Sequence, residues 1–284
     1  MKVLVTGYNG QLGYDVVREG LKHGFNMHGI GRKDLDLTVE EDVKKYIKNI
    51  KPDAIIHCAA YTAVDNAEDD KETCRNVNVK ATKYIATAAK ETKAKFMYIS
   101  TDYVFDGAGE RPFVETDKPS PIGYYGLSKY EGEKVVEQLL ENWFIVRISW
   151  VFGINGNNFV KTMLRLAESR NELSVVGDQF GSPTYTFDLA RLLIDMIQTE
   201  KFGTYHATNE GYCSWDEFAK EIFKQANKRI TVNSITSEQY PTRAIRPKNS
   251  RLSKQKLIDN GFKPLLEWQD ALKQYLIELT QEVK

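Results

Sequence analysis

The fold of this chain is decided by residues 2–13, which read KVLVTGYNGQLG. Residues 3–6 are aliphatic or β-branched, as expected for a buried strand. A turn containing Gly7, Gly10 and Gly13 follows, and the chain after it has the pattern of a helix. Strand, glycine-rich turn and helix in this order open a βαβ unit and predict a parallel sheet.

Each of the three glycines has its own use in such a turn. Gly7 permits a tight turn, Gly10 lets the backbone approach a pyrophosphate, and Gly13 allows the helix to pack closely on the strand. The N-terminus of the helix then faces the phosphates. We therefore interpret this stretch as a dinucleotide-binding turn. No Gly-Lys-Ser/Thr follows the glycines, which excludes a P-loop.

Short β-rich runs alternate with longer amphipathic segments through the first half of the chain. The predicted strands are residues 2–6, 26–30, 54–58, 96–100 and 144–148. The predicted helices are residues 38–50, 81–90, about 128–142, 159–167, 187–199, 214–226 and 265–278. Thr38 is expected to cap the first of these helices, in a capping box with Glu41.

These elements predict an α/β protein with a Rossmann-type, doubly wound parallel sheet and a smaller C-terminal α/β lobe. A Gly/Asn-rich loop after Trp150 marks the point where the regular alternation of strands and helices ends. We assign residues 1–152 to an NAD(P)-binding domain, with a returning segment near 184–206. Residues 153–183 and 207–284 are assigned to a substrate-binding lobe.

Composition narrows the class of protein. The 284 residues include 39 Lys+Arg and 39 Asp+Glu, so the net charge is zero and no nucleic-acid partner is expected. No apolar run approaches about 18 residues, so no membrane span is expected. The three cysteines share no C-x-x-C spacing and the four histidines are scattered. This arrangement does not predict a structural zinc site. The chain enters a strand without a leader, and we expect a cytoplasmic protein.

The end of the second predicted strand bears on the choice of cofactor. An acidic residue there binds the adenosine ribose of NAD, whereas an arginine accommodates the extra phosphate of NADP. Residues 31–37 read GRKDLDL. Arg32 and Lys33 lie where a 2′-phosphate would sit, and Asp34 and Asp36 follow. The sequence favours NADPH and leaves NADH as the alternative.

Candidate catalytic residues lie in YGLSK, residues 125–129. Tyr125 and Lys129 are four residues apart, so they share one helix face and can point into the same cleft. An ammonium group beside a phenol favours the phenolate, and we expect it to bring the pKa of Tyr125 towards neutrality. Thr101 follows a predicted strand, at the sheet edge where parallel sheets bind ligands, and can hydrogen-bond a reacting oxygen.

Together these motifs resemble the extended short-chain dehydrogenase/reductase superfamily, and more narrowly the dTDP-4-dehydrorhamnose reductases. The similar stretches cover nearly the whole chain in order: residues 59–65 (AAYTAVD), 100–107 (STDYVFDG), 147–151 (RISWV), 178–184 (DQFGSPT) and 246–252 (RPKNSRL). The resemblance implies an NAD(P)H-dependent oxidoreductase that reduces the C4 ketone of dTDP-4-dehydro-L-rhamnose. Its product, dTDP-L-rhamnose, serves cell-surface polysaccharide biosynthesis.

The resemblance also implies roles for individual residues. Tyr125 would donate a proton to the developing alkoxide, Thr101 would hydrogen-bond the carbonyl oxygen, and Lys129 would bind the nicotinamide ribose. The remaining implied cofactor contacts are Gly10, Gln11 and Leu12 at the pyrophosphate, Asp36 and Leu37 at the adenosine, and Ala59, Ala60 and Tyr61 at the middle.

Substrate contacts are implied by the same resemblance. Asp102 and Trp150 map to the sugar site, and Asn78 lies where related enzymes carry a helix asparagine that orders the active site; a helix cap is the alternative for Asn78. Arg246 and Arg251 are candidate cations for the nucleotide diphosphate, because guanidinium matches phosphate bidentately. The sequence does not choose between the two arginines.

Other readings remain open. Some family members bind magnesium at a dimer interface, and the positions that align are Asp15, Asp188 and a residue near Asp270; we predict no metal. The protein is expected to be a monomer or a homodimer. The alternatives to the reductase are another extended short-chain nucleotide-sugar reductase or epimerase, or a non-catalytic regulatory subunit of the same fold. A dehydratase is disfavoured because no glutamate follows Asp102.

Overall fold

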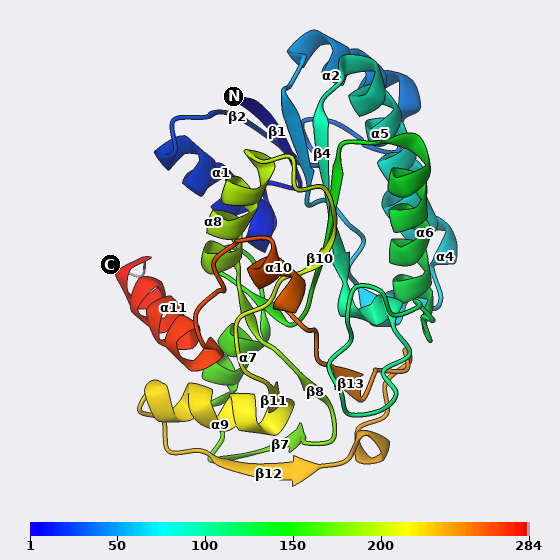
Figure 1. The fold of residues 1–284 in the computed structure, drawn as a ribbon. Coiled ribbons are helices and arrows are strands. Elements are labelled where there is room, and N and C mark those ends of the chain that lie inside the picture. Colours follow the sequence, from blue (N-terminus) through cyan, green and yellow to red (C-terminus); the bar gives the residue numbers. More distant parts are fainter. Residues whose placement is uncertain (283–284) are drawn as a thin grey trace.

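A six-stranded parallel sheet, ordered β10-β5-β4-β3-β1-β2, forms the centre of the larger lobe in the computed structural model, which describes residues 1–282 (Figure 1). Its strands are β1 (Lys2–Thr6), β2 (Asn26–Ile30), β3 (Ala54–His57), β4 (Lys95–Thr101), β5 (Trp143–Ile148) and β10 (Gly203–His206). Every neighbouring pair is parallel. The chain runs outward from β1 to β2 and then crosses to β3, so the strand order reverses between β1 and β3. Open sheets bind ligands at such a reversal.

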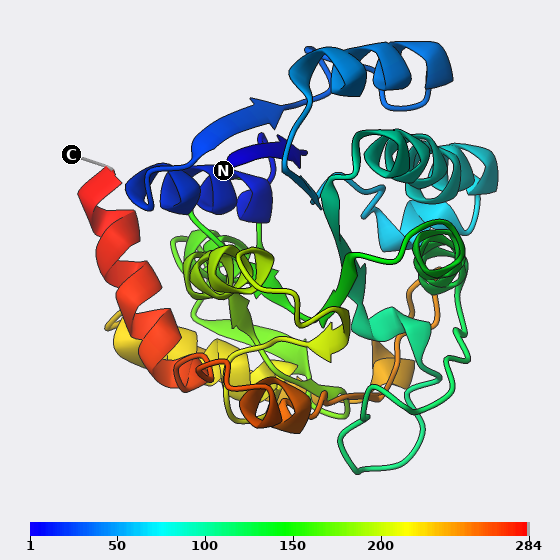
Figure 2. The same ribbon diagram turned by 45° about the horizontal axis from the view of Figure 1, so that its top comes forward.

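Helices cover both faces of this sheet, because successive strand residues point to opposite sides. On one side, Val3 and Val5 pack towards α1 (Gln11–Lys22) and α8 (Thr186–Ile197). On the other side, Leu4 packs with residues of three helices, seen as a separate layer in Figure 2: α2 (Glu40–Ile50), α5 (Ala81–Thr92) and α6 (Tyr124–Leu139). The Rossmann-type fold class expected from the sequence is confirmed.

Two predicted helix starts are wrong. The helix expected from about residue 128 begins at Tyr124, because Gly123 is extended and the Tyr124 backbone N–H donates to Glu68, 2.7 Å away. The predicted capping box at Thr38 is absent: α2 begins at Glu40, and the Thr38 hydroxyl donates instead to Asp36 at 2.7 Å. A nearby carboxylate thus competes successfully for the capping hydroxyl.

Several elements that follow β5 lie beyond the large sheet (Figure 1). Their apolar side chains build a second hydrophobic core. Its helices are α7 (Phe159–Leu166), α9 (Trp215–Gln225) and α11 (Trp268–Glu282). Its short strands are β6 (Val151–Phe152), β7 (Glu172–Val176), β8 (Phe180–Gly181), β9 (Thr184–Tyr185), β11 (Cys213–Ser214), β12 (Thr231–Ile235) and β13 (Asn249–Ser250). β8 lies between β11 and β13, while β7 pairs with β12 and β6 with β9.

Shorter helical segments complete the chain. They are α3 (Val64–Ala67), α4 (Lys71–Arg75), a π-helix (Asn76–Lys80), 3₁₀-helices at Asp102–Val104 and Ser237–Gln239, and α10 (Gln255–Asp259). Among the described residues, none of the helices is both long and apolar enough to cross a bilayer.

Candidate active site

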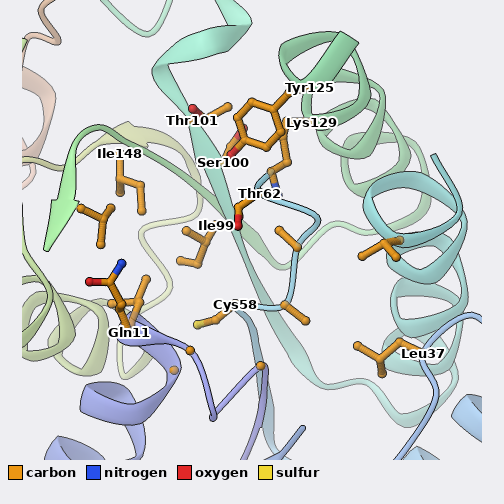
Figure 3. Close-up of a pocket in the computed structure, with 18 of the residues that line it drawn as sticks. Gln11, Leu37, Cys58, Thr62, Ile99, Ser100, Thr101, Tyr125, Lys129 and Ile148 are labelled. Atoms are coloured by element: carbon orange, nitrogen blue, oxygen red, sulfur yellow. The ribbon is translucent and has the colours of Figure 1, made fainter. Parts of the chain in front are cut away.

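A cleft of about 790 Å³ lies at the carboxyl ends of β1, β3, β4 and β5. Figure 3 shows its extent: Gln11 and Leu37 lie towards one end, and Thr101, Tyr125 and Lys129 lie together at the other. The predicted residues that line it are Gly7, Gly10, Gln11, Leu12, Gly13, Arg32, Asp36, Leu37, Ala59, Ala60, Thr101, Asp102, Tyr125, Lys129 and Trp150. Folding therefore brings the glycine-rich turn and the Tyr–Lys pair into one cavity.

Two glycines of the glycine-rich turn, Gly7 and Gly13, have no room for a side chain. Gly7 has a φ of 72°, and a Cβ there would lie 2.7 Å from the backbone nitrogen of Ala59 at the end of β3. A Cβ on Gly13 would collide with the carbonyl oxygen of Gly7. Gly10 caps α1 without a side chain, and the first turn of α1 holds no acidic residue. The free backbone N–H groups at the N-terminus of α1 therefore suit an anion such as a pyrophosphate.

The end of the cleft near Leu37 carries charges of both signs. Arg32 and Asp36 are exposed there, and Leu37 is half-buried. Hydrogen bonds from the hydroxyl and the backbone N–H of Thr38, 2.7 and 2.9 Å long, lower the pKa of Asp36, with a further contribution from Arg32. Asp36 is therefore a carboxylate that can accept a ribose hydroxyl, beside a guanidinium that can meet a phosphate.

The opposite end of the cleft holds the candidate catalytic groups. Thr101 ends β4 and Tyr125 lies in the first turn of α6. The Thr101 hydroxyl hydrogen-bonds the Tyr125 phenol and donates to Asp102 Oδ1 at 2.9 Å. Burial, together with the charge of Asp102, raises the pKa of Tyr125 above its usual value. The phenol is thus protonated at neutral pH and has a proton to give.

Lys129 lies one turn beyond Tyr125 and is only 2 % exposed. Its Nζ sits 4.0 Å from the centre of the Tyr98 ring, an arrangement that favours the ammonium. Burial nevertheless lowers the pKa of Lys129 to about 7. The expectation that this ammonium brings the pKa of Tyr125 down is therefore wrong, because burial and the charge of Asp102 raise the pKa of Tyr125, while burial lowers that of Lys129.

Asp102 is a buried carboxyl group, 3 % exposed, next to Thr101. Burial raises its pKa to about 6, against the opposing hydrogen bonds from Ser250 and Thr101. Ser250 belongs to β13, so Asp102 lies where the two lobes meet. At neutral pH it presents a largely desolvated charge to the cleft, which suits an acceptor for a sugar hydroxyl.

We expect Asp102→Asn to stabilise the fold at neutral pH. The folded state holds the Asp102 proton more tightly than the unfolded chain. The wild-type protein is therefore most stable below about pH 4, and it loses stability as pH rises through about 6 because the buried carboxyl group must ionise. The variant should gain about 3 kcal/mol in the free energy of unfolding near pH 8 and little at acid pH. Urea titrations at both pH values measure this, with exposed Asp106→Asn as the control. A pH-independent difference would contradict it.

The helix asparagine proposed from sequence connects the cofactor side to α6. Asn78 is buried in the π-helix, where its Oδ1 accepts from the Tyr61 backbone N–H at 2.8 Å. Its Nδ2 donates to the Ser128 hydroxyl at 2.9 Å, so it is not a helix cap. Sequence reasoning missed Ser128 as its partner, as well as Tyr98 beneath Lys129. The only available signal for Ser128 was its place inside the YGLSK motif.

Three predicted residues lie outside the lining of the cleft: Tyr61, Arg246 and Arg251. Arg246 stands just behind it, with hydrogen bonds to the Tyr103 hydroxyl at 3.1 Å and to Asp65 at 2.5 Å. Tyr103 itself lines the cleft. Arg251 points elsewhere, since its guanidinium covers the ring of Phe180 at 4.4 Å.

Asp15 and Asp188, which align with the magnesium site of some family members, have different hydrogen-bond partners. Asp15 accepts from the Thr186 hydroxyl at 2.5 Å and lies 3.6 Å from Arg18. Asp188 accepts from Asn209 at 2.9 Å. Within residues 1–282, no three His, Cys, Asp or Glu side chains come together as a metal site.

A Rossmann-type sheet that places a glycine-rich turn and a Tyr-x-x-x-Lys pair in one cleft defines an extended short-chain dehydrogenase/reductase. Residues 1–281 match the family model described as the RmlD substrate binding domain, and the chain belongs to this family.

Named relatives agree with this family. The chain is 42 % identical to a dTDP-4-dehydrorhamnose reductase of Aggregatibacter actinomycetemcomitans, over 96 % of this chain and 97 % of that protein. It is 38 % identical to the spore coat polysaccharide biosynthesis protein SpsK of Bacillus subtilis, over 98 % and 97 %. The crystal structure of a dTDP-4-dehydrorhamnose reductase from Bacillus anthracis in complex with NADP superposes with a TM-score of 0.95, at 43 % identity over 98 % of this chain and 99 % of that one.

Proposed function

We propose that this protein reduces the C4 ketone of dTDP-4-dehydro-L-rhamnose to the alcohol of dTDP-L-rhamnose, with NADPH as the reductant. The relatives from Aggregatibacter actinomycetemcomitans and Bacillus anthracis carry the name of this activity, and the second was crystallised with NADP. The observation that carries the proposal is the position of Tyr125 beside Thr101 and Lys129, in the same cleft as the glycine-rich turn. The product would feed cell-surface polysaccharide synthesis.

The cleft fits a nicotinamide dinucleotide along its length. The backbone at Gly10, Gln11 and Leu12 would hold the pyrophosphate, where added Cβ atoms at the neighbouring glycines have no room. Asp36 would accept a hydroxyl of the adenosine ribose, with Arg32 for the 2′-phosphate of NADP. When bound, the reduced nicotinamide supplies a hydride to the carbonyl carbon.

The reacting end of the cleft supplies the proton. Tyr125 would deliver its phenolic proton to the oxygen of the ketone as charge develops there, while the Thr101 hydroxyl would turn its single proton from Asp102 to that oxygen. Lys129, whose pKa is about 7, would in its protonated form stabilise the tyrosinate left behind. The buried surroundings strengthen each of these interactions, because little water screens them.

The sugar and the diphosphate would contact different residues around the cleft. Asp102 would accept a hydrogen bond from a sugar hydroxyl, and the indole of Trp150 would pack on the sugar ring. Of the two candidate arginines, Arg246 is better placed for the diphosphate, because its partner Tyr103 lines the cleft. Residues 1–152 and 184–206 would thus bind the cofactor, and the lobe of residues 153–183 and 207–284 would bind the substrate together with Asp102 and Trp150 of the first part.

The assay that tests this function follows the oxidation of NADPH, and separately of NADH, on addition of dTDP-4-dehydro-L-rhamnose. We expect consumption with NADPH and a product that carries two more hydrogens. An epimerase would change the sugar without consuming added reductant, and a regulatory subunit would do neither. Either result would refute the reductase.

We place the protein in the cytoplasm as a monomer or homodimer; sedimentation of the purified protein decides between these two states.

A further inference from the structure

Trp150 has a strained backbone at the edge of the cleft. Its φ is 48°, in the left-handed region that bulky side chains rarely adopt. Such strain persists only where the surrounding structure fixes the residue, and strained residues concentrate at functional sites. Trp150 lines the cleft between the ends of β5 and β6. Its neighbours must therefore supply what keeps it in this conformation.

The first neighbour is a second indole from the smaller lobe. Trp215 stacks on Trp150 with ring centres 3.7 Å apart and planes inclined by 14°. Trp215 is the first residue of α9, directly after Ser214, whose side chain forms a capping box with Glu217. It also packs on Phe159 at 4.6 Å, inside the second hydrophobic core. The position of Trp215 is therefore fixed by a helix start and by a core, independently of the cleft.

The second neighbour is a glycine that leaves room for the Trp150 indole. A Cβ on Gly181 would lie 2.7 Å from Cε2 of Trp150, nearer than real Cβ contacts come. Gly181 belongs to β8, and its register partner in β11 is Cys213, two residues before Trp215. The β8–β11 pair thus brings the space beside the indole and the stacking partner to the same place.

We propose that Trp215, with the room left by Gly181, positions Trp150 as a wall of the sugar site and thereby sets the affinity for the dehydrosugar. The inference rests on the proposed function, in which Trp150 packs against the sugar. Trp215 acts through Trp150, so it is a positioning residue and not a catalytic one. Since Trp215 is not among the residues that line the cleft, its loss should weaken sugar binding through Trp150 and leave cofactor binding unchanged.

The test compares Trp215→Leu with the wild-type enzyme in steady-state kinetics. We expect the KM for dTDP-4-dehydro-L-rhamnose to rise about tenfold, the scale of one aromatic contact, with the KM for NADPH unchanged. Trp215→Phe should restore much of the loss. Circular dichroism should show the coupled indole signal of a stacked pair in the wild type and its loss in Trp215→Leu. Gly181→Ala, which crowds Trp150 directly, should raise the sugar KM without removing Trp215.

Trp268→Phe is the matched control, because Trp268 is a buried tryptophan of the same core that packs on Phe218 at 5.6 Å. It should lower the melting temperature and leave the sugar KM at the wild-type value. A wild-type sugar KM in both Trp215→Leu and Gly181→Ala would overturn the inference, as would equal rises in the two KM values. A wild-type protein that fails to oxidise NADPH would instead defeat the proposed function, so the two failures are distinguishable.

Discussion

Tyr125→Phe is expected to lower kcat for ketone reduction by about 10²–10⁴-fold, the usual contribution of a positioned proton donor. The substitution removes only the hydroxyl that Thr101 hydrogen-bonds and leaves the ring in place against Tyr103, 5.6 Å away. Because the glycine-rich turn at the other end of the cleft is untouched, the Kd for NADPH should not change. Stopped-flow turnover and fluorescence titration with NADPH measure the two quantities separately.

Tyr124→Phe provides the control for this variant. Tyr124 is the preceding residue of α6, and its ring faces Lys71, whose Nζ lies 5.5 Å from the ring centre. Losing its hydroxyl should leave kcat near the wild-type value. If Tyr125→Phe turned over at the rate of Tyr124→Phe, the proton would have to come from elsewhere, and the assigned role of Tyr125 would be wrong.

The parts of the fold that the sequence predicts best are those with local causes. The turn around Gly7 and Gly13 follows from steric requirements of a few neighbouring residues, and the structure shows the same requirement as contacts with Ala59. The strands are runs of apolar residues covered on both faces, so their pattern alone locates them. Tyr125 and Lys129 share a helix face because of their spacing, whatever surrounds the helix.

The parts that the sequence does not predict depend on contacts between distant segments. Asn78 meets Ser128 across fifty positions, and Trp215 meets Trp150 across the two lobes. No periodicity records such pairs. The pKa of Tyr125 was expected in the wrong direction for the same reason: the local pattern reveals the neighbouring lysine but not the burial, which is the larger effect. The predicted cap at Thr38 is absent because a carboxylate outside the capping motif, Asp36, accepts its hydroxyl.

A buried ion pair fixes the helix that carries the catalytic pair. Glu133 lies one turn beyond Lys129 on α6 and forms two hydrogen bonds with Arg147 of β5, at 2.9 and 2.7 Å. Their side chains are 1 % and 4 % exposed. His206 of β10 lies 3.5 Å from the same guanidinium. Two fully desolvated charges in this geometry stabilise each other, and each is costly without the other.

Glu133→Gln is therefore expected to lower the free energy of unfolding by about 3–5 kcal/mol, because it leaves the Arg147 guanidinium buried without a counter-charge. Glu131→Gln removes a comparable charge two residues earlier, from an exposed pair with Arg75, and should cost about 0–1 kcal/mol. Denaturant titrations of the two variants give the comparison.

The double variant Glu133→Leu/Arg147→Met separates a buried charge from lost packing. Apolar side chains of similar volume can replace a buried pair with little loss of stability. We expect this variant to recover most of the stability that Glu133→Gln loses. A double variant as unstable as Glu133→Gln would show that packing or the contact with His206, rather than the unpaired guanidinium, dominates at this position.

The charge of Glu133 also raises the pKa of Lys129, against the effect of burial. As the pH is raised, variants without this charge should therefore lose activity at a lower pH than the wild type, because Lys129 gives up its proton earlier.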